Sequence, residues 1–137
     1  MPVFRLTATL ALGLLALALV GCSSSNTPTT PLAPFEPEII NTADNFQFQA
    51  TGLTRTTTTV SYPWENSATQ ATINHSSVVN QGTTLLSLFD ADSTLVYSDS
   101  LQASASHQTA VGTAGTWTVQ VTLTVVNGTL NFRAESL

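Results

Sequence analysis

The stretch that decides the fold is residues 117–132, which read WTVQVTLTVVNGTLNF. Apolar side chains occupy every second position from Trp117 to Val125, and threonine or glutamine fills the positions between them. Strict alternation places one face of a β-strand against a core and the other face in water. Asn127-Gly128 follows, and both residues tolerate the positive φ angles of a type I′ turn. The stretch therefore predicts two strands joined by a hairpin turn.

A two-residue turn fixes the register of this predicted hairpin. Val126 is expected to pair with Thr129, and Leu123 with Phe132. Apolar residues then meet on one face and polar residues on the other, whereas a slip of one residue would invert every side chain. Turn chemistry and hydrophobic pattern thus agree.

The same alternation recurs upstream in shorter segments that are bounded by turn residues. After residue 22, we find no ten-residue segment with the 3.6-residue spacing of a helix. Seven or eight short strands in residues 44–137 predict an all-β domain built as an antiparallel β-sandwich. The further strands are expected at residues 46–50, 60–64, 71–75, 84–89, 94–97 and 108–111.

Two segments carry a resemblance to a known family. Residues 88–96 read LFDADSTLV, and residues 114–121 read AGTWTVQV. Over residues 82–132 the chain resembles the bacterial pre-peptidase C-terminal domain, with Ser93 where that family usually has glycine. The resemblance implies a β-sandwich of jelly-roll type, which in that family is appended to secreted enzymes. It implies a fold and no catalytic activity.

The N-terminal residues 1–21 have the pattern of a signal peptide. Arg5 is the only charge, and residues 6–20 form an apolar run that is shorter than the about 20 residues of a membrane-spanning helix. The run ends in Leu19-Val20-Gly21-Cys22, which resembles the lipobox of bacterial lipoproteins.

The resemblance implies lipidation of Cys22, the single cysteine of the chain. In lipoproteins diacylglycerol is attached to this thiol, the chain is cut before it, and the new amino group is usually acylated, for example with palmitate. Two or three acyl chains anchor a protein persistently, whereas one chain binds reversibly. We therefore expect a bacterial cell-envelope protein that meets the membrane through its lipid. Ser23 resembles the residue at that position in lipoproteins of the outer membrane, if the host is Gram-negative.

Residues 22–43 are expected to form a flexible linker after the lipidated cysteine. Four prolines lie in residues 23–37, and proline disfavours both helix and sheet interior. The spacing of Pro28, Pro31 and Pro34 also fits a PxxP ligand for a partner, but a plain spacer explains it better beside a lipid anchor.

Composition excludes several classes of function. The chain has 137 residues, a net charge of −5 and three basic residues, which are Arg5, Arg55 and Arg133. Scattered arginines do not provide the clustered phosphate contacts of a nucleic-acid binder. Without lysine, Schiff-base chemistry and a P-loop are excluded. One cysteine cannot form a disulfide within the chain.

A calcium site is one candidate for binding chemistry. Asp90, Asp92 and Asp99 could supply the carboxylate oxygens that Ca²⁺ prefers. The alternative is a hairpin turn over residues 90–93, in which an aspartate accepts hydrogen bonds from its own backbone. The turn is the better interpretation, and no other cofactor is expected.

Tyr62 and Trp64 are the candidate ligand-binding residues, because exposed aromatic rings stack on sugars. Both share the phase of Val60 and would then be core, although Pro63 indicates an edge strand where one could be exposed. An exposed pair would favour a carbohydrate- or peptide-binding module.

No catalytic arrangement stands out in the sequence. His75 and His107 lack neighbouring ligands at metal spacing, and solvent-facing strand positions explain both. Glu65 with an aspartate could act as a glycosidase pair, so a small hydrolase remains an alternative. The sequence favours a lipid-anchored β-sandwich with a structural, adhesive or ligand-binding role toward a protein or glycan partner.

Overall fold

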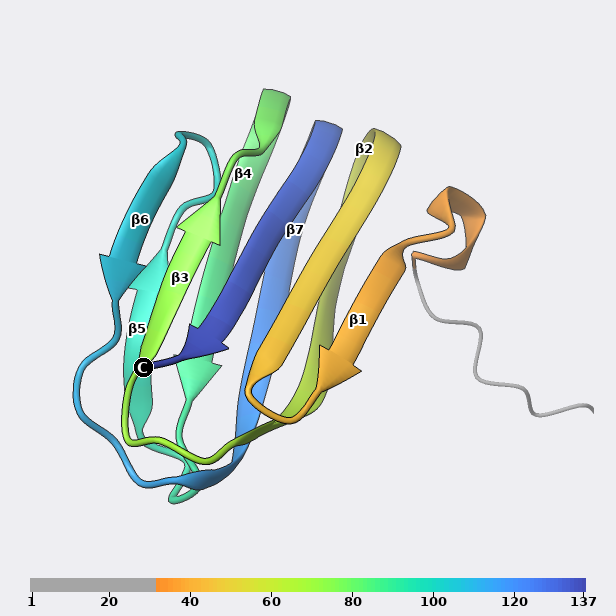
Figure 1. The fold of residues 1–137 in the computed structure, drawn as a ribbon. Coiled ribbons are helices and arrows are strands. Elements are labelled where there is room, and N and C mark those ends of the chain that lie inside the picture. Colours follow the sequence, from red (N-terminus) through yellow and green to blue (C-terminus); the bar gives the residue numbers. More distant parts are fainter. Residues whose placement is uncertain (1–31) are drawn as a thin grey trace, which may run out of the picture.

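The computed structural model describes residues 32–137 and is almost entirely antiparallel β-sheet (Figure 1). Its seven strands confirm the predicted all-β sandwich, and the sheet does not close on itself. In chain order the elements are the 3₁₀ helix η1 (Ala33–Phe35), β1 (Glu38–Thr42), β2 (Asn45–Asn66), β3 (Ala71–His75), β4 (Val78–Phe89), β5 (Leu95–Asp99), β6 (Ala105–Gln108) and β7 (Gly115–Ser136).

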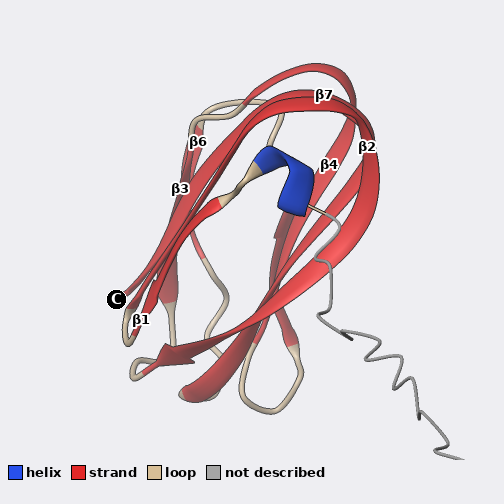
Figure 2. Ribbon diagram, turned by 90° about the vertical axis from the view of Figure 1, so that its right-hand side faces the viewer, coloured by secondary structure: helices blue, strands red, loops and turns tan. Residues whose placement is uncertain are grey.

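The sandwich has two layers that share their long strands. The first layer contains β1, residues 45–50 of β2, residues 130–136 of β7, β3 and β6. The second layer contains the later part of β2, the earlier part of β7, and β4 with β5. In Figure 2, β2 and β7 arch over one end of the molecule and pass from one layer into the other.

Bulges at a common level bend the long strands. The pairing of β2 with β7 shifts register three times between Ala50 and Thr58, and the pairing of β4 with β7 shifts between Val79 and Thr83. Residues with positive φ lie in the same region of each strand. Because bulges kink a strand and increase its twist, they allow one sheet to fold over into two layers. The positive-φ residues of the bend are Gly52 and Arg55 in β2, Gly82 in β4, and Val125 and Gly128 in β7, whereas Gly115, which also has a positive φ, begins β7 away from the bend.

The predicted hairpin at Asn127-Gly128 is wrong. β7 runs without a turn from Gly115 to Ser136, and Val126 pairs with Thr56 of β2 instead of Thr129. Gly128 does adopt a positive φ of 146°, but it does so at a bulge in the bend. Asn-Gly satisfies a turn and a bulge equally well at the local level. Pairing with β2 on one side and β4 on the other keeps β7 extended.

The core lies between the layers and follows the predicted alternation. In β7, Trp117, Val119 and Val121 are completely buried, while the residues between them are partly exposed. Phe48 and Phe132 face each other across paired strands, with ring centroids 5.2 Å apart and planes at 18°. The alternation therefore holds within each layer and is interrupted at the bend. There Val125, which the sequence pattern placed on the core face, is 37% exposed, and its neighbour Val126 is completely buried.

The described fold includes residues that precede the predicted boundary at residue 44. Leu32 is completely buried, Phe35 packs against the core, and β1 pairs with β2 from Glu38 to Thr42. This corrects the linker prediction for residues 32–43, because a proline that precedes an edge strand removes no ladder hydrogen bond. The predicted signal peptide, Cys22 and the rest of the linker lie outside the described residues.

Candidate functional site

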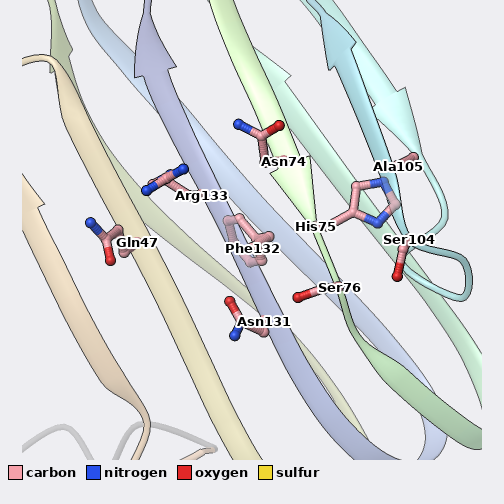
Figure 3. A pocket seen from close by; sticks show the side chains of 9 residues that line it. All are labelled: Gln47, Asn74, His75, Ser76, Ser104, Ala105, Asn131, Phe132 and Arg133. Atoms are coloured by element: carbon pink, nitrogen blue, oxygen red, sulfur yellow. The ribbon is translucent and has the colours of Figure 1, made fainter.

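A polar depression of about 490 Å³ lies on the outer face of the first layer. Its lining comes from β2, β3, β6, β7 and the segments next to β3 and β6 (Figure 3). Most lining side chains are amides, hydroxyls or charged groups. The lining residues are Gln47, Asn74, His75, Ser76, Ser104, Ala105, Asn131, Phe132 and Arg133.

Strand register explains why polar side chains gather there. Arg133 of β7 pairs with Gln47 of β2 on one side and with Asn74 of β3 on the other. Their neighbours along each strand, such as Phe46 and Phe132, are buried in the core. Because successive side chains alternate between faces, the three polar residues form one row across the outer face.

Several lining groups have unused hydrogen-bonding capacity. Within residues 32–137, the side chains of Asn74, Asn131, Ser76 and Ser104 form no hydrogen bond to another residue. An amide offers two donors and one acceptor oxygen, and a hydroxyl offers both functions. The depression can therefore donate hydrogen bonds to a ligand and accept them from it.

Arg133 is held at one side of the depression by an acidic neighbour. Its Nε lies 3.4 Å from Oε2 of Glu135, and the two side chains are 47% and 39% exposed. Glu135 Oε1 also accepts a hydrogen bond from Asn45 Nδ2, and Asn45 Oδ1 accepts one from Gln47 Nε2. Glu135 thus compensates the positive charge of Arg133, and hydrogen bonds through Asn45 connect Glu135 to Gln47.

His75 forms the opposite side of the depression and is 5% exposed. Figure 3 shows its ring turned toward Ser104 and Ala105, away from Arg133. Neither ring nitrogen makes a hydrogen bond of normal geometry among the described residues, although the Ala103 backbone lies close enough to interact with the ring. Burial lowers the pKa of His75 and His107 lowers it further, while the negative charge of Asp99 and the Ala103 backbone oppose the shift. The ring is therefore neutral at pH 7, with one N–H donor and one acceptor nitrogen.

The solvent-facing position predicted for His75 is wrong, whereas His107 is exposed. His107 Nε2 lies 3.6 Å from Oδ2 of Asp99 on β5. Nearby on β5, Tyr97 has a buried hydroxyl without a partner in residues 32–137. Burial and the charge of Asp99 raise the pKa of Tyr97 to about 12. The two histidines lie on neighbouring strands, which the sequence spacing did not indicate.

The three aspartates of the calcium hypothesis do not form a site. Within residues 32–137, no group of three or more His, Cys, Asp or Glu side chains is arranged to hold a metal ion. Oδ1 of Asp90 accepts hydrogen bonds from the backbone N–H groups of Asp92 and Thr94, at 3.0 and 2.8 Å. Asp90 Oδ2 accepts another from Thr113 at 2.9 Å. Asp99 lies apart, in β5, so the turn interpretation holds for Asp90.

Hydrogen bonds also set the ionisation of Asp90. The bond from the Thr94 backbone is the main cause of its lowered pKa, and those from Thr113 and Asp92 act in the same direction. The carboxylate is consequently a structural acceptor that ties the β4–β5 turn to the segment before β7.

The candidate ligand-binding residues Tyr62 and Trp64 do not form an exposed aromatic pair. Trp64 is 1% exposed, its Nε1 donates to the Thr42 carbonyl, and it meets Trp117 edge to face with centroids 5.9 Å apart. Tyr62 is half-buried against Phe46. Tyr62 and Trp64 therefore serve the core, as their phase with Val60 indicates.

Comparison with protein-family models gives no match, and comparison with curated proteins gives no similar chain. In the described part of the chain, no helix is long and apolar enough to span a membrane.

Proposed function

We propose that this protein is a lipoprotein of the bacterial cell envelope, whose β-sandwich binds a ligand or partner outside the cytoplasm. The observation that carries the anchoring proposal is the sequence Leu19-Val20-Gly21-Cys22, which places the single cysteine at the lipobox position behind an apolar run. A thiolate is the side-chain nucleophile suited to forming the thioether of such an anchor.

The position of the folded domain supports a role close to the membrane surface. Leu32 is already buried in the fold, and ten peptide links separate it from Cys22 (32 − 22 = 10). Ten residues span at most about 36 Å when fully extended. The domain would therefore remain near the lipid headgroups.

The depression favours binding as the role of the domain, rather than hydrolysis. It combines amide and hydroxyl groups that make no hydrogen bond to another residue with a neutral, buried histidine at its edge. Within residues 32–137, no serine hydroxyl is hydrogen-bonded to a histidine, so the nucleophile–base pair of a hydrolase lacks support there. The resemblance to a domain appended to secreted enzymes agrees with an accessory role.

Lipidation is tested in bacterial cells with an alkyne-labelled fatty acid. The natural chain is expected to incorporate the label and to sediment with membranes, whereas Cys22→Ser should stay unlabelled as a longer precursor. Ser23→Ala is the matched control and should be lipidated as well. A labelled Cys22→Ser variant, or an unlabelled natural chain, would contradict the proposal.

Ser23 also predicts which membrane the protein reaches in a Gram-negative host. Density-gradient separation of the two membranes should place the natural chain in the outer membrane, while Ser23→Asp should retain it in the inner membrane. Equal distribution of the two proteins would contradict this sorting.

A further inference from the structure

We propose that the depression on the first layer binds a neutral saccharide. This inference rests on the proposed binding role and names the class of ligand. The proposed sugar site is on the outer face of the first layer, which carries Gln47, Arg133 and Asn74. It is therefore distinct from Trp64, which is buried in the second layer.

The depression offers hydrogen-bonding groups of the kind that complement a sugar. A sugar hydroxyl is both donor and acceptor, and a side-chain amide presents complementary donors and an acceptor in one plane. Asn74 and Asn131 have uncommitted amides, and they lie on the adjacent strands β3 and β7. Adjacent strands are about 4.8 Å apart, so such side chains can contact several hydroxyls of one ligand.

His75 lies at the edge of the depression beside Ser104 and Ala105, and it is inward in β3 where Asn74 is outward. It is 5% exposed, and apart from the nearby Ala103 backbone neither ring nitrogen makes a hydrogen bond of normal geometry within the described chain. Buried polar groups without partners are rare in folded proteins and call for a bound group or water. A hydroxyl can accept a hydrogen bond from the N–H of a neutral imidazole or donate one to its other nitrogen.

The charge of the domain favours a neutral sugar over an acidic one. Residues 32–137 contain two arginines and eight acidic residues, a balance of 2 − 8 = −6. At the depression itself, Glu135 compensates Arg133 at 3.4 Å. A polyanionic ligand would meet repulsion from the domain without a free positive patch to offset it.

The depression suits a protein partner less well than a small ligand. Protein interfaces are centred on buried apolar and aromatic side chains. Among the large hydrophobic residues that are exposed in residues 32–137, none lines the depression, and only Ile40 lies beside it. The volume of about 490 Å³ also falls in the range of small-ligand sites.

The test uses the full-length, lipidated protein in detergent and measures binding by isothermal titration calorimetry. The probes are neutral tetrasaccharides of β-1,4-glucose, α-1,4-glucose, β-1,4-xylose, β-1,4-mannose and β-1,4-N-acetylglucosamine. Tetrasaccharides of galacturonate and hyaluronan form the acidic arm. We expect at least one neutral probe to bind, and the acidic probes to bind at least tenfold more weakly.

Variants locate the site. Asn131→Ala and Asn74→Ala are each expected to weaken binding of the neutral probe at least tenfold. Gln120→Ala is the control, because Gln120 is a partly exposed amide on the same strand as Asn131, but in the second layer. Far-ultraviolet circular dichroism of all three variants confirms that they remain folded.

Three results would overturn the inference: no binding by any neutral probe, tighter binding of an acidic probe, or loss of binding in Gln120→Ala but not in Asn131→Ala and Asn74→Ala. Failure of this inference is distinct from failure of the proposed function, since Cys22 labelling reports on anchoring alone. A protein that is labelled and membrane-bound but binds no neutral probe would support the lipid anchor and contradict the saccharide site.

Discussion

At the scale of single residues, His75 shows what the fold imposes on a side chain. It follows Ala71 and Ile73 in the inward phase of β3, so the strand turns it away from bulk water. The titratable groups around it are Asp99, which favours its charged form, and His107, which disfavours it. Tyr97, on the same strand as Asp99, has a raised pKa and stays protonated at neutral pH.

His75 predicts that the domain loses stability in mild acid. Its folded-state pKa is below the value of about 6.5 for an unfolded histidine, so the unfolded chain binds more protons as pH falls. The stabilising effect is present above that unfolded pKa and is lost below it, with a slope of at most about 1.4 kcal/mol per pH unit. Urea unfolding of residues 32–137 between pH 7.5 and 5.5 measures the loss.

A pair of histidine variants assigns this pH dependence. His75→Gln should flatten the dependence, whereas the exposed control His107→Gln should leave most of it. An unchanged slope in His75→Gln would show that another group is responsible.

At the scale of elements, the alternation of side chains was predictable, and the connection between segments was not. The periods at residues 46–50 and 60–64 gave the correct inward residues, yet both segments belong to the single strand β2. Likewise, Asn127-Gly128 lies within β7. Asn and Gly both tolerate a positive φ, so the pair is compatible with a turn or a bulge. Only pairing with the distant strands decides between the two.

Gly128 provides the direct test of the bend. A Cβ at this position would overlap the carbonyl oxygen of Val78, and the φ of 146° is unfavourable for other residues. Gly128→Ala is expected to cost about 3 kcal/mol or more in unfolding free energy. Gly52→Ala is the control, because Gly52 has a φ of 66° with open space around it. It should cost about 1 kcal/mol.

Chemical denaturation of both glycine variants distinguishes a bulge from a hairpin. In a hairpin, Gly128 would sit in an exposed turn, and its replacement would resemble that of Gly52. Equal losses in the two variants would therefore contradict the bent β7.

At the scale of the whole molecule, the candidate site depends on the register of distant strands. Gln47 and Arg133 alternate with apolar neighbours in the sequence, but Asn74 was not predicted to face outward, because the sequence placed the adjacent His75 in solvent. The row that the three residues form also needs the pairing of β2, β7 and β3. The same applies to β1, which directly follows the proline-rich segment and shows its strand structure only through its pairing with β2. Tyr62 and Trp64 were candidates for ligand binding because they are aromatic, and in the structure both pack in the core.

The domain boundary predicts the outcome of truncation. A fragment of residues 32–137 should be as stable as one of residues 23–137, because it contains the buried Leu32, η1 and all seven strands of the described fold. A fragment of residues 44–137 lacks Leu32 and the pairing of β1 with β2, and should lose more than about 3 kcal/mol. Thermal and urea unfolding of the three fragments provide the comparison. Equal stability of all three fragments would show that residues 32–43 do not contribute to the domain.

Membrane attachment of this folded domain is tested most directly by mass spectrometry of the mature protein extracted from bacterial membranes. We predict a chain that begins at Cys22 and carries a thioether-linked diacylglyceryl group with an additional amide-linked acyl chain. A membrane-extracted chain with a free Cys22 thiol, or one that begins at another residue, would contradict it.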